Sequence, residues 1–453
     1  MENRTDEIAL ATDLYEFTMG ASYLALDMEH EATFSLFVRQ LPAGRAFLVA
    51  AGLAEALKRL KRLRFDPATL DYLRSTGQIR QDFLAWLRDF RFTGEVRAVP
   101  EGRAVFAGEP LLEVRAPIAQ AQLVETLLLN AVHYPTLVAS KAARYVAVAG
   151  GRALVEFGLR RTPSIDAGLA AARAAYLAGF VGTSNLLAGT RYDIPVSGTM
   201  AHSFVQVFPS ERAAFLAFAE TFPGPVTLLI DTYDTLQGAR HTVEVARELA
   251  KRQRKIAAVR IDSGDFLTLS REVRAILDES GFPEIQIIAS GGLDERHLAE
   301  LVREEAPIDA FGIGTRLGVV ADTPSLEMVY KLVAYAGHGT AKLSRGKATI
   351  AGPKQVWRRL GADGRYAEDM IATAAEPAPG PEWEPLLVPV MRGGEMAEAP
   401  LLAESRQRHR EEMALLPDWL KQLDPERVYR VCLSARLRAE HEATIAAIQR
   451  QAE

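Results

Sequence analysis

The segment Arg260–Asp265 (RIDSGD) places an arginine and two carboxylates at the end of an apolar run. Asp262 or Ser263 before a helix can serve as an N-cap, which is an ordinary structural role. An arginine inside an apolar run, however, needs an anionic partner once it is buried. A sugar diphosphate with Mg²⁺ would engage both Arg260 and the carboxylates, so the segment indicates a site for such a ligand.

Two glycine-rich segments, SGG and GIGTR, each follow a later apolar run. Both can be simple tight turns, but glycines also let backbone N–H groups approach an anion. β/α barrels commonly bind phosphate in the loops after their last two strands, and these segments come last in the series. We therefore expect a phosphate to lie against Gly291, Gly292, Gly314 and Thr315.

His202 differs from the other seven histidines because it follows Gly198–Ala201 and is expected beside the polar residues that follow the apolar runs. The others fall in polar, helical or uninformative surroundings. No histidine pair has metal-ligand spacing with a carboxylate, so no transition-metal centre and no metal ligand are expected. His202 is a candidate functional residue, with an ordinary surface histidine as the alternative.

A repeated strand–helix pattern must position these residues. Five short apolar runs are typical of parallel strands buried on both faces, at 153–157, 226–230, 257–261, 285–289 and 308–311. Helical patterns lie between them, at 167–178, 210–220, 239–252, 266–280 and 295–305. Such alternation predicts a complete or incomplete β/α barrel, whose active site lies at the carboxyl ends of its strands. Polar residues that follow the runs should therefore meet at one edge.

Length and composition set broad limits. The 453 residues predict two or three domains, and 48% hydrophobic with 25% charged residues is typical of a globular protein. The net charge of −5 and the pI of about 6.0 argue against a nucleic-acid partner. A single cysteine excludes an internal disulfide and a thiolate zinc cluster. The polar start and the lack of an apolar run of ~20 residues predict a cytoplasmic protein with no membrane partner.

Taken together, these motifs resemble the nicotinate phosphoribosyltransferase family. The likeness runs from TDLY at 12–15 to VYKLV at 329–333. Between them, in the family's order, stand FGLRR at 157–161, GTSN at 182–185, GTMAHS at 198–203, DTYDT at 231–235 and RIDSGD at 260–265. The segment TPSI at 162–165 differs from the sequence that is usual in the family at this point, which leaves the conformation of that loop open.

The resemblance implies a type II phosphoribosyltransferase: an irregular β/α barrel with a second α+β domain built from the N- and C-terminal segments. We place an N-terminal α+β segment at 1–118, the barrel at 119–335 and the completing C-terminal segment at 336–453. The implied reaction joins nicotinate to phosphoribosyl pyrophosphate, giving nicotinate mononucleotide and pyrophosphate. It uses Mg²⁺, is coupled to ATP hydrolysis through a phosphohistidine, and is the first step of NAD salvage from nicotinate.

By the same resemblance, His202 is the phosphorylated catalytic histidine, and we expect Asp231 to orient it. Tyr15 is expected to stack on the pyridine ring in the neighbouring subunit's site, which implies a homodimer with shared active sites. Ser184, with Arg160 or Arg161, should bind the carboxylate of nicotinate. The full set of expected substrate-binding residues is Tyr15, Phe157, Arg160, Arg161, Ser184, Thr199, Arg260, Asp262, Gly291, Gly292, Gly314 and Thr315.

Three other interpretations remain open at this point. The chain can be a phosphoribosyltransferase that acts on nicotinamide or on quinolinate. It can be a β/α-barrel isomerase or aldolase that has only the phosphate site in common with this family. Among the residues that directly follow the apolar runs, however, no lysine stands out as a Schiff-base nucleophile. A non-catalytic nucleotide-binding or scaffold protein is disfavoured because residue types suited to catalysis are in place.

Overall fold

The computed structural model describes residues 7–344, 347, 349–397 and 401–452. These residues form two compact units, one from the segments up to Ser140 and from Ser325 on, the other from Lys141–Pro324. The second domain is thus built from both chain ends, as the resemblance implied. We placed the borders at 118/119 and 335/336. The compact units instead meet at Ser140/Lys141, within helix α6 (Glu125–Val148), and at Pro324/Ser325, because strand β12 (Met328–Tyr335) pairs with β1 of the second domain.

The unit Lys141–Pro324 alternates strands and helices as the apolar runs predicted. Its strands are β6 (Ala153–Glu156), β7 (Gly182–Thr183), β8 (Val226–Leu229), β9 (Ile256–Ile261), β10 (Gln286–Ser290) and β11 (Ala310–Ile313). Its helices are η2 (Leu159–Arg161), α7 (Ile165–Leu177), α8 (Leu186–Tyr192), α9 (His202–Gln206), α10 (Glu211–Thr221), α11 (Thr235–Ala250), α12 (Phe266–Glu279), α13 (Glu295–Arg303) and α14 (Thr315–Gly318).

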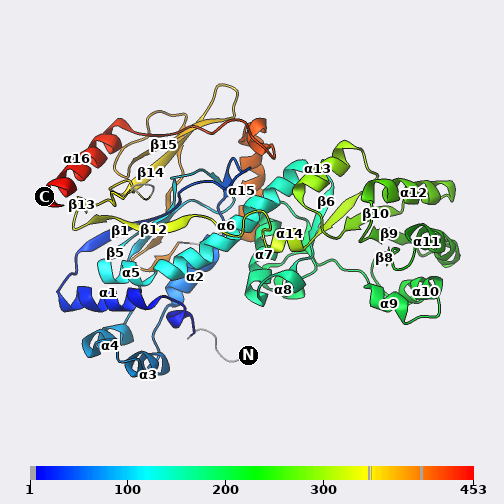
Figure 1. Ribbon diagram of the computed structural model, residues 1–453, viewed down its shortest axis with the longest axis horizontal. Coiled ribbons are helices and arrows are strands. Elements are labelled where there is room, and N and C mark those ends of the chain that lie inside the picture. Colours follow the sequence, from blue (N-terminus) through cyan, green and yellow to red (C-terminus); the bar gives the residue numbers. More distant parts are fainter. Residues whose placement is uncertain (1–6, 345–346, 348, 398–400, 453) are drawn as a thin grey trace. The chain divides into compact units, whose positions relative to one another are not determined.

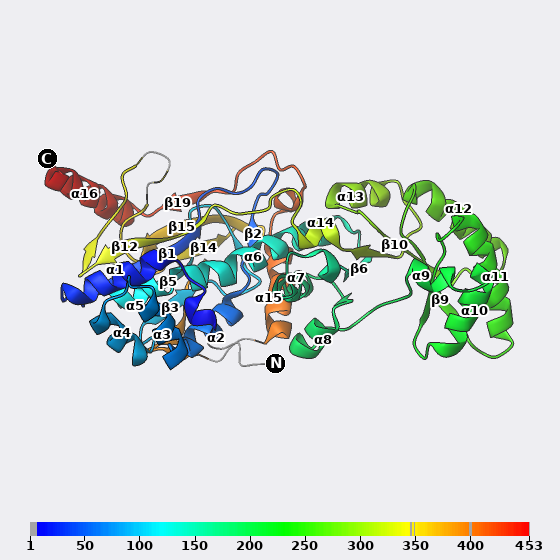
Figure 2. The same ribbon diagram turned by 60° about the horizontal axis from the view of Figure 1, so that its bottom comes forward.

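These strands form one parallel sheet in the order β7-β6-β11-β10-β9-β8. The last strand, β11, lies beside the first, β6, so loops far apart in the sequence become neighbours at the carboxyl edge. Helices α10, α11 and α12 lie along β8, β9 and β10 in both views (Figures 1 and 2). The sheet is an incomplete barrel, which confirms the predicted fold class.

The other unit is an α+β structure with a seven-stranded antiparallel sheet in the order β13-β12-β1-β5-β3-β17-β18. Its remaining strands are β1 (Glu31–Val38), β2 (Leu48–Val49), β3 (Glu95–Ala98), β4 (Ala104–Val105), β5 (Pro110–Pro117), β13 (His338–Gly339), β14 (Lys354–Leu360), β15 (Tyr366–Thr373), β16 (Trp383–Pro385), β17 (Val388–Arg392), β18 (Glu395–Met396) and β19 (Val431–Leu433). Its helices are η1 (Glu7–Leu10), α1 (Leu14–Ala25), α2 (Leu53–Arg62), α3 (Pro67–Ser75), α4 (Gln81–Arg88), α5 (Ile118–Leu123), the first part of α6, α15 (Leu402–Leu415), η3 (Asp418–Lys421) and α16 (Ala435–Ala452). Among all described helices, none combines the length and apolar character needed to cross a membrane.

Strand β1 is buried on both faces because helices α1 and α5 cover one side of its sheet and strands β14 and β15 cover the other (Figure 1). Phe34 and Leu36 belong to the apolar core, and Phe34 stacks on Tyr330 of β12. Ser35, on the opposite face, donates a hydrogen bond to the buried carboxylate of Glu113. The polar side chains on this face, which β14 and β15 cover, are therefore hydrogen-bonded between neighbouring strands.

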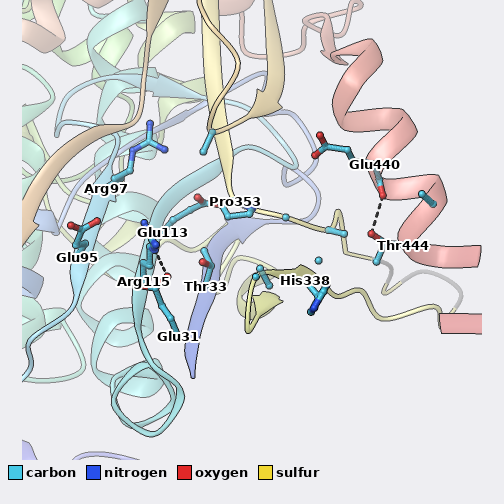
Figure 3. A pocket seen from close by; sticks show the side chains of 17 residues that line it. Glu31, Thr33, Glu95, Arg97, Glu113, Arg115, His338, Pro353, Glu440 and Thr444 are labelled. Atoms are coloured by element: carbon cyan, nitrogen blue, oxygen red, sulfur yellow. Dashed lines mark hydrogen bonds and ion pairs between the residues drawn. The ribbon is translucent and has the colours of Figure 1, made fainter. Parts of the chain in front are cut away.

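A cavity of 650 Å³ opens on this polar face (Figure 3). Arg115 of β5 forms an ion pair with Glu31 of β1 there, and Arg97 of β3 donates to the carbonyl oxygens of Lys354 and Leu387. None of the predicted site residues lines this cavity. All of its lining residues belong to the α+β unit.

Lys354 makes the stability of this unit depend on pH. Burial lowers the pKa of Lys354 from 10.5 to about 8, although Glu113 opposes the shift from 3.8 Å. Between these two pKa values the unfolded chain holds a proton that the folded chain has lost, so the free energy of unfolding rises with pH through that window. The rise is roughly 3 kcal/mol, and Lys354→Met should remove it. Urea unfolding of both proteins from pH 7.5 to 10.5 checks this; parallel curves would contradict it.

Candidate active site

The strand order brings the predicted segments together along one edge of the parallel sheet. Ser184 follows β7, Phe157 follows β6, Gly314 follows β11, Gly291 follows β10 and Asp262 follows β9. Because the strands are parallel, their carboxyl ends share that edge. The structure thus places these residues side by side, as the alternation predicted.

The Arg260 side chain, at the end of β9, is partly buried. Its Nη2 donates to the carbonyl oxygen of Met200 over 3.1 Å, while its Nε is buried without a hydrogen-bond partner among the described residues. Burial lowers the pKa of Arg260, opposed by Asp262 and Asp231 and reinforced by the like charge of Arg160. Two neighbouring cations and an open donor are suited to a multiply charged anion.

Two carboxylates tie the ends of β8, β9 and β10 together. Asp231 Oδ2 accepts hydrogen bonds from the Asp262 amide (3.0 Å) and the Ser263 hydroxyl (2.7 Å). Asp262 Oδ1 accepts from the Ser290 hydroxyl. Asp231 Oδ1 is buried and makes no hydrogen bond with any described residue.

His202 is the first residue of α9, and its Nδ1 lies 3.1 Å from the hydroxyl of Thr232. The expected partner was Asp231, but the turn after β9 occupies Asp231 Oδ2. The neighbouring residue Thr232 contacts the ring in its place. No described residue makes a hydrogen bond with Nε2, which leaves this nitrogen as the one open to a reacting group.

Glu156, which the motifs did not single out, fixes the junction between two of the expected binding segments. Its buried carboxylate accepts hydrogen bonds from the Gly158 amide and from the Thr183 hydroxyl, and burial raises its pKa. It therefore holds the FGLRR segment against the end of β7. A carboxylate inside the apolar run ALVEF was the signal that could have identified it.

Ser184 is exposed at the end of β7, and its amide donates to the carbonyl oxygen of Glu156 over 2.8 Å. The N-cap of α8 is Asn185, whose Oδ1 accepts from the Ala188 amide at 3.1 Å. The Ser184 hydroxyl is therefore not used to cap this helix. It is available to a ligand, as its expected role requires.

Two of the glycines are required by close packing. Gly291 has a left-handed φ of +98°, and a Cβ there would lie 2.0 Å from the carbonyl oxygen of Asp262. A Cβ on Gly312 would lie 2.5 Å from the ring of Phe157, which therefore packs against β11. The tight-turn interpretation holds for Gly291, and its exposed backbone still faces the edge.

The remaining predicted residues lie nearby or in the other unit. Arg160 and Arg161 are exposed on η2, and Thr199 donates to the carbonyl oxygen of Met200 (3.2 Å) in the segment that Arg260 also contacts. Tyr15 belongs to α1 of the other unit and is 43% exposed.

Comparison of the chain with known proteins identifies the family to which it belongs. The model of the nicotinate phosphoribosyltransferase N-terminal domain matches residues 10–133, and that of the nicotinate phosphoribosyltransferase family matches residues 152–349. The chain is 48% identical to nicotinate phosphoribosyltransferase pncB2 of Mycobacterium tuberculosis, over 95% of this chain and 93% of that protein. It is 42% identical to nicotinate phosphoribosyltransferase of Bacillus subtilis, over 82% of this chain and 77% of that protein.

A solved structure agrees with these sequence relationships. The crystal structure of human nicotinic acid phosphoribosyltransferase superposes with a TM-score of 0.87 at 33% identity, covering 95% of this chain and 99% of the human chain. Motifs, fold and relatives thus agree over almost the whole length. The chain belongs to the nicotinate phosphoribosyltransferase family.

Proposed function

We propose that this protein transfers the phosphoribosyl group of phosphoribosyl pyrophosphate to nicotinate, forming nicotinate mononucleotide and pyrophosphate. The observation that carries the proposal is the convergence at the carboxyl edge of two arginines, Arg260 and Arg160, with the carboxylate of Asp262. Guanidinium groups clustered beside a carboxylate are suited to a sugar diphosphate ligand. The family supplies the identity of that ligand.

The chemistry requires opposite charges to be stabilised on either side of the ribose C1. The bond from C1 to pyrophosphate breaks as the bond to the pyridine nitrogen forms, through an oxocarbenium-like state. Arg260, Arg160 and Arg161 stabilise the negative charge of the departing pyrophosphate. Asp262, whose Oδ1 is held by Ser290, accepts hydrogen bonds from the ribose hydroxyls.

The 5′-phosphate is expected in the loops after β10 and β11. Gly291 and Gly292 are exposed there, and Gly314 and Thr315 begin the loop after β11. Backbone N–H groups of such loops approach an anion without obstruction from a Cβ. This arrangement separates the 5′-phosphate of the substrate from the pyrophosphate beside Arg260.

Mg²⁺ fits this site as an ion bound mainly through the substrate. The described residues contain no group of three or more His, Cys, Asp or Glu side chains that could hold a metal. Mg²⁺ commonly needs only one or two carboxylates besides phosphate oxygens and water, and Asp231 Oδ1 with Asp262 can supply them. When bound, Mg²⁺ neutralises charge on the leaving pyrophosphate.

ATP enters as a co-substrate through His202. We propose that His202 Nε2 attacks the γ-phosphorus of ATP and releases ADP, and that the phosphorylated histidine beside the pyrophosphate pocket tightens binding of phosphoribosyl pyrophosphate. Water then hydrolyses the phosphohistidine to inorganic phosphate and regenerates His202. This coupling makes the enzyme an ATP-dependent ligase that catalyses the first step of NAD salvage from nicotinate. The open Nε2 of His202 supports the assignment.

A binding measurement distinguishes this function from the alternatives. Calorimetric titration with phosphoribosyl pyrophosphate and Mg²⁺ should give tight, saturable binding, and nicotinate should compete neither with it nor with ribose 5-phosphate. A barrel isomerase or aldolase would bind ribose 5-phosphate as tightly as phosphoribosyl pyrophosphate. If the diphosphate brought no gain in affinity over ribose 5-phosphate, the assigned role of Arg260 would be wrong.

We also propose a homodimer in which Tyr15 completes the partner's site. Tyr15, Leu14 and Met19 form an exposed apolar strip on α1, with exposed fractions of 43, 42 and 36%. Such a strip is suited to an interface. Tyr15→Ala should raise KM for nicotinate about tenfold, as expected from the loss of one ring stack.

Subunit mixing provides the test of shared sites. When Tyr15→Ala and His202→Ala proteins are combined under conditions that exchange subunits and are assayed with limiting nicotinate, the mixture should regain roughly a quarter of the ATP-dependent activity of the wild type, because about half of the dimers are mixed and one of the two sites in each is intact. A monomer in sedimentation, or no recovery on mixing, would contradict the shared site.

A further inference from the structure

Lys141 forms a buried ionic junction between two loops of the parallel-sheet unit. Its side chain is 2% exposed, and its Nζ lies 2.7 Å from Glu295 Oε2 and 2.6 Å from Asp322 Oδ1. Glu295 begins α13, directly after the loop that follows β10, and Asp322 lies in the segment that follows β11. One ammonium group thus joins the ends of both glycine-containing loops.

The loop after β10 has further attachments to α6. Arg144 Nε lies 3.0 Å from Glu295 Oε1, and the Tyr145 hydroxyl donates to the carbonyl oxygen of Leu293 over 3.0 Å. Burial raises the pKa of Tyr145, so its hydroxyl remains a donor throughout the physiological range. This loop would therefore keep its position if Lys141 were lost.

The loop after β11 contains a strained residue close to Asp322. Val320 is fully buried with a left-handed φ of +43°, a conformation that β-branched residues strongly disfavour. Such a conformation persists only where surrounding contacts impose it. Backbone hydrogen bonds at Val320, Ala321 and Thr323 hold this turn, and the ion pair of Asp322 with Lys141 fixes a residue within it.

We propose that Lys141 is a positioning residue for the 5′-phosphate subsite, because it holds the loop after β11 at a fixed distance from the loop after β10. The inference rests on the proposed function. Lys141 and Arg144 balance the charges of Glu295 and Asp322, so the cluster adds little net field at the phosphate. Its effect is on the geometry of the backbone donors around Gly314 and Thr315.

Two substitutions test this role. Lys141→Met leaves Glu295 paired with Arg144, while Asp322, whose side chain is 37% exposed, can be hydrated. Asp322→Asn removes the ion pair with Lys141 with little change in side-chain size. It keeps the proposal testable if Lys141→Met fails to fold. Each should raise the Kd for ribose 5-phosphate and the KM for phosphoribosyl pyrophosphate about tenfold, with KM for nicotinate unchanged. The double variant should be no worse than Lys141→Met alone, because Lys141→Met already breaks the ion pair that Asp322→Asn removes.

A matched control separates positioning from general destabilisation. Leu249→Ala empties a buried position near the end of α11, at the edge of the sheet opposite the site, and should lower stability with the Kd for ribose 5-phosphate unchanged. Wild-type Kd and KM values in folded Lys141→Met and Asp322→Asn proteins would overturn the inference. If the wild-type protein itself bound neither ribose 5-phosphate nor phosphoribosyl pyrophosphate, the proposed function would fail instead.

Discussion

His202→Ala is expected to abolish ATP hydrolysis and phosphoenzyme formation while leaving a slow formation of nicotinate mononucleotide without ATP. The ATP-dependent rate should fall at least about a thousandfold, as when a covalent nucleophile is removed. Displacement at the ribose C1 needs no nucleophile from the protein, so the basal reaction should remain. The contact of Nδ1 with Thr232 favours attack by Nε2, the open nitrogen.

The measurement is incubation with γ-labelled ATP, followed by acid and alkali treatment of the protein. Wild type should carry an acid-labile, alkali-stable phosphate, and His202→Ala should carry none. His297→Ala is the control, because His297 is an exposed histidine of α13 in the same unit. Acid-labile phosphate on His202→Ala would place the phosphorylated residue elsewhere.

Ser184→Asp should weaken the use of nicotinate sharply. By resemblance, the related nicotinamide-using enzymes carry aspartate here, which can accept from a carboxamide NH₂. Against the carboxylate of nicotinate, an aspartate at ~4 Å costs between about 1 kcal/mol in water and about 4 kcal/mol at an effective dielectric of ~20. The expected loss in kcat/KM is therefore about 5- to 1000-fold, and nicotinamide should become a better substrate relative to nicotinate.

Two uncharged variants are the controls for this charge effect. Ser184→Asn has nearly the shape of aspartate without its charge, and Ser184→Ala removes only the hydroxyl, so each should lose less activity than Ser184→Asp. Because Asn185 caps α8, none of these changes removes the cap. Unchanged kcat/KM for nicotinate in Ser184→Asp would mean that other residues, such as Arg160 or Arg161, select the base.

The sheet and its polar edge were predictable from local patterns. Near-continuous apolar runs such as VTLLI identify strands buried on both faces, and the parallel order follows from the helices between them. Residues directly after the runs, such as Asp262 and Gly291, could be placed at one edge because parallel strands end together. Nothing beyond short-range periodicity and chain order was needed.

Contacts between distant segments could not be derived in this way. Thr232 contacts His202, whereas its neighbour Asp231 accepts from the turn after β9, and a sequence does not show which of two adjacent side chains reaches the ring. Glu156 and Lys141 lie within apolar stretches, where their partners come from strands and loops far along the chain. The border of the units at Ser140 was also hidden, because α6 continues through it without a break.

Product analysis tests the proposed function most directly. The protein is incubated with nicotinate, phosphoribosyl pyrophosphate and Mg²⁺, with and without ATP, and nicotinate mononucleotide, pyrophosphate and ADP are quantified in the same samples. We expect equal amounts of mononucleotide and pyrophosphate, a faster reaction with ATP, and, beyond the one equivalent of ADP released when the enzyme is phosphorylated, ADP formed only as the mononucleotide accumulates. Consumption of phosphoribosyl pyrophosphate without mononucleotide, or no consumption at all, would contradict phosphoribosyl transfer to nicotinate.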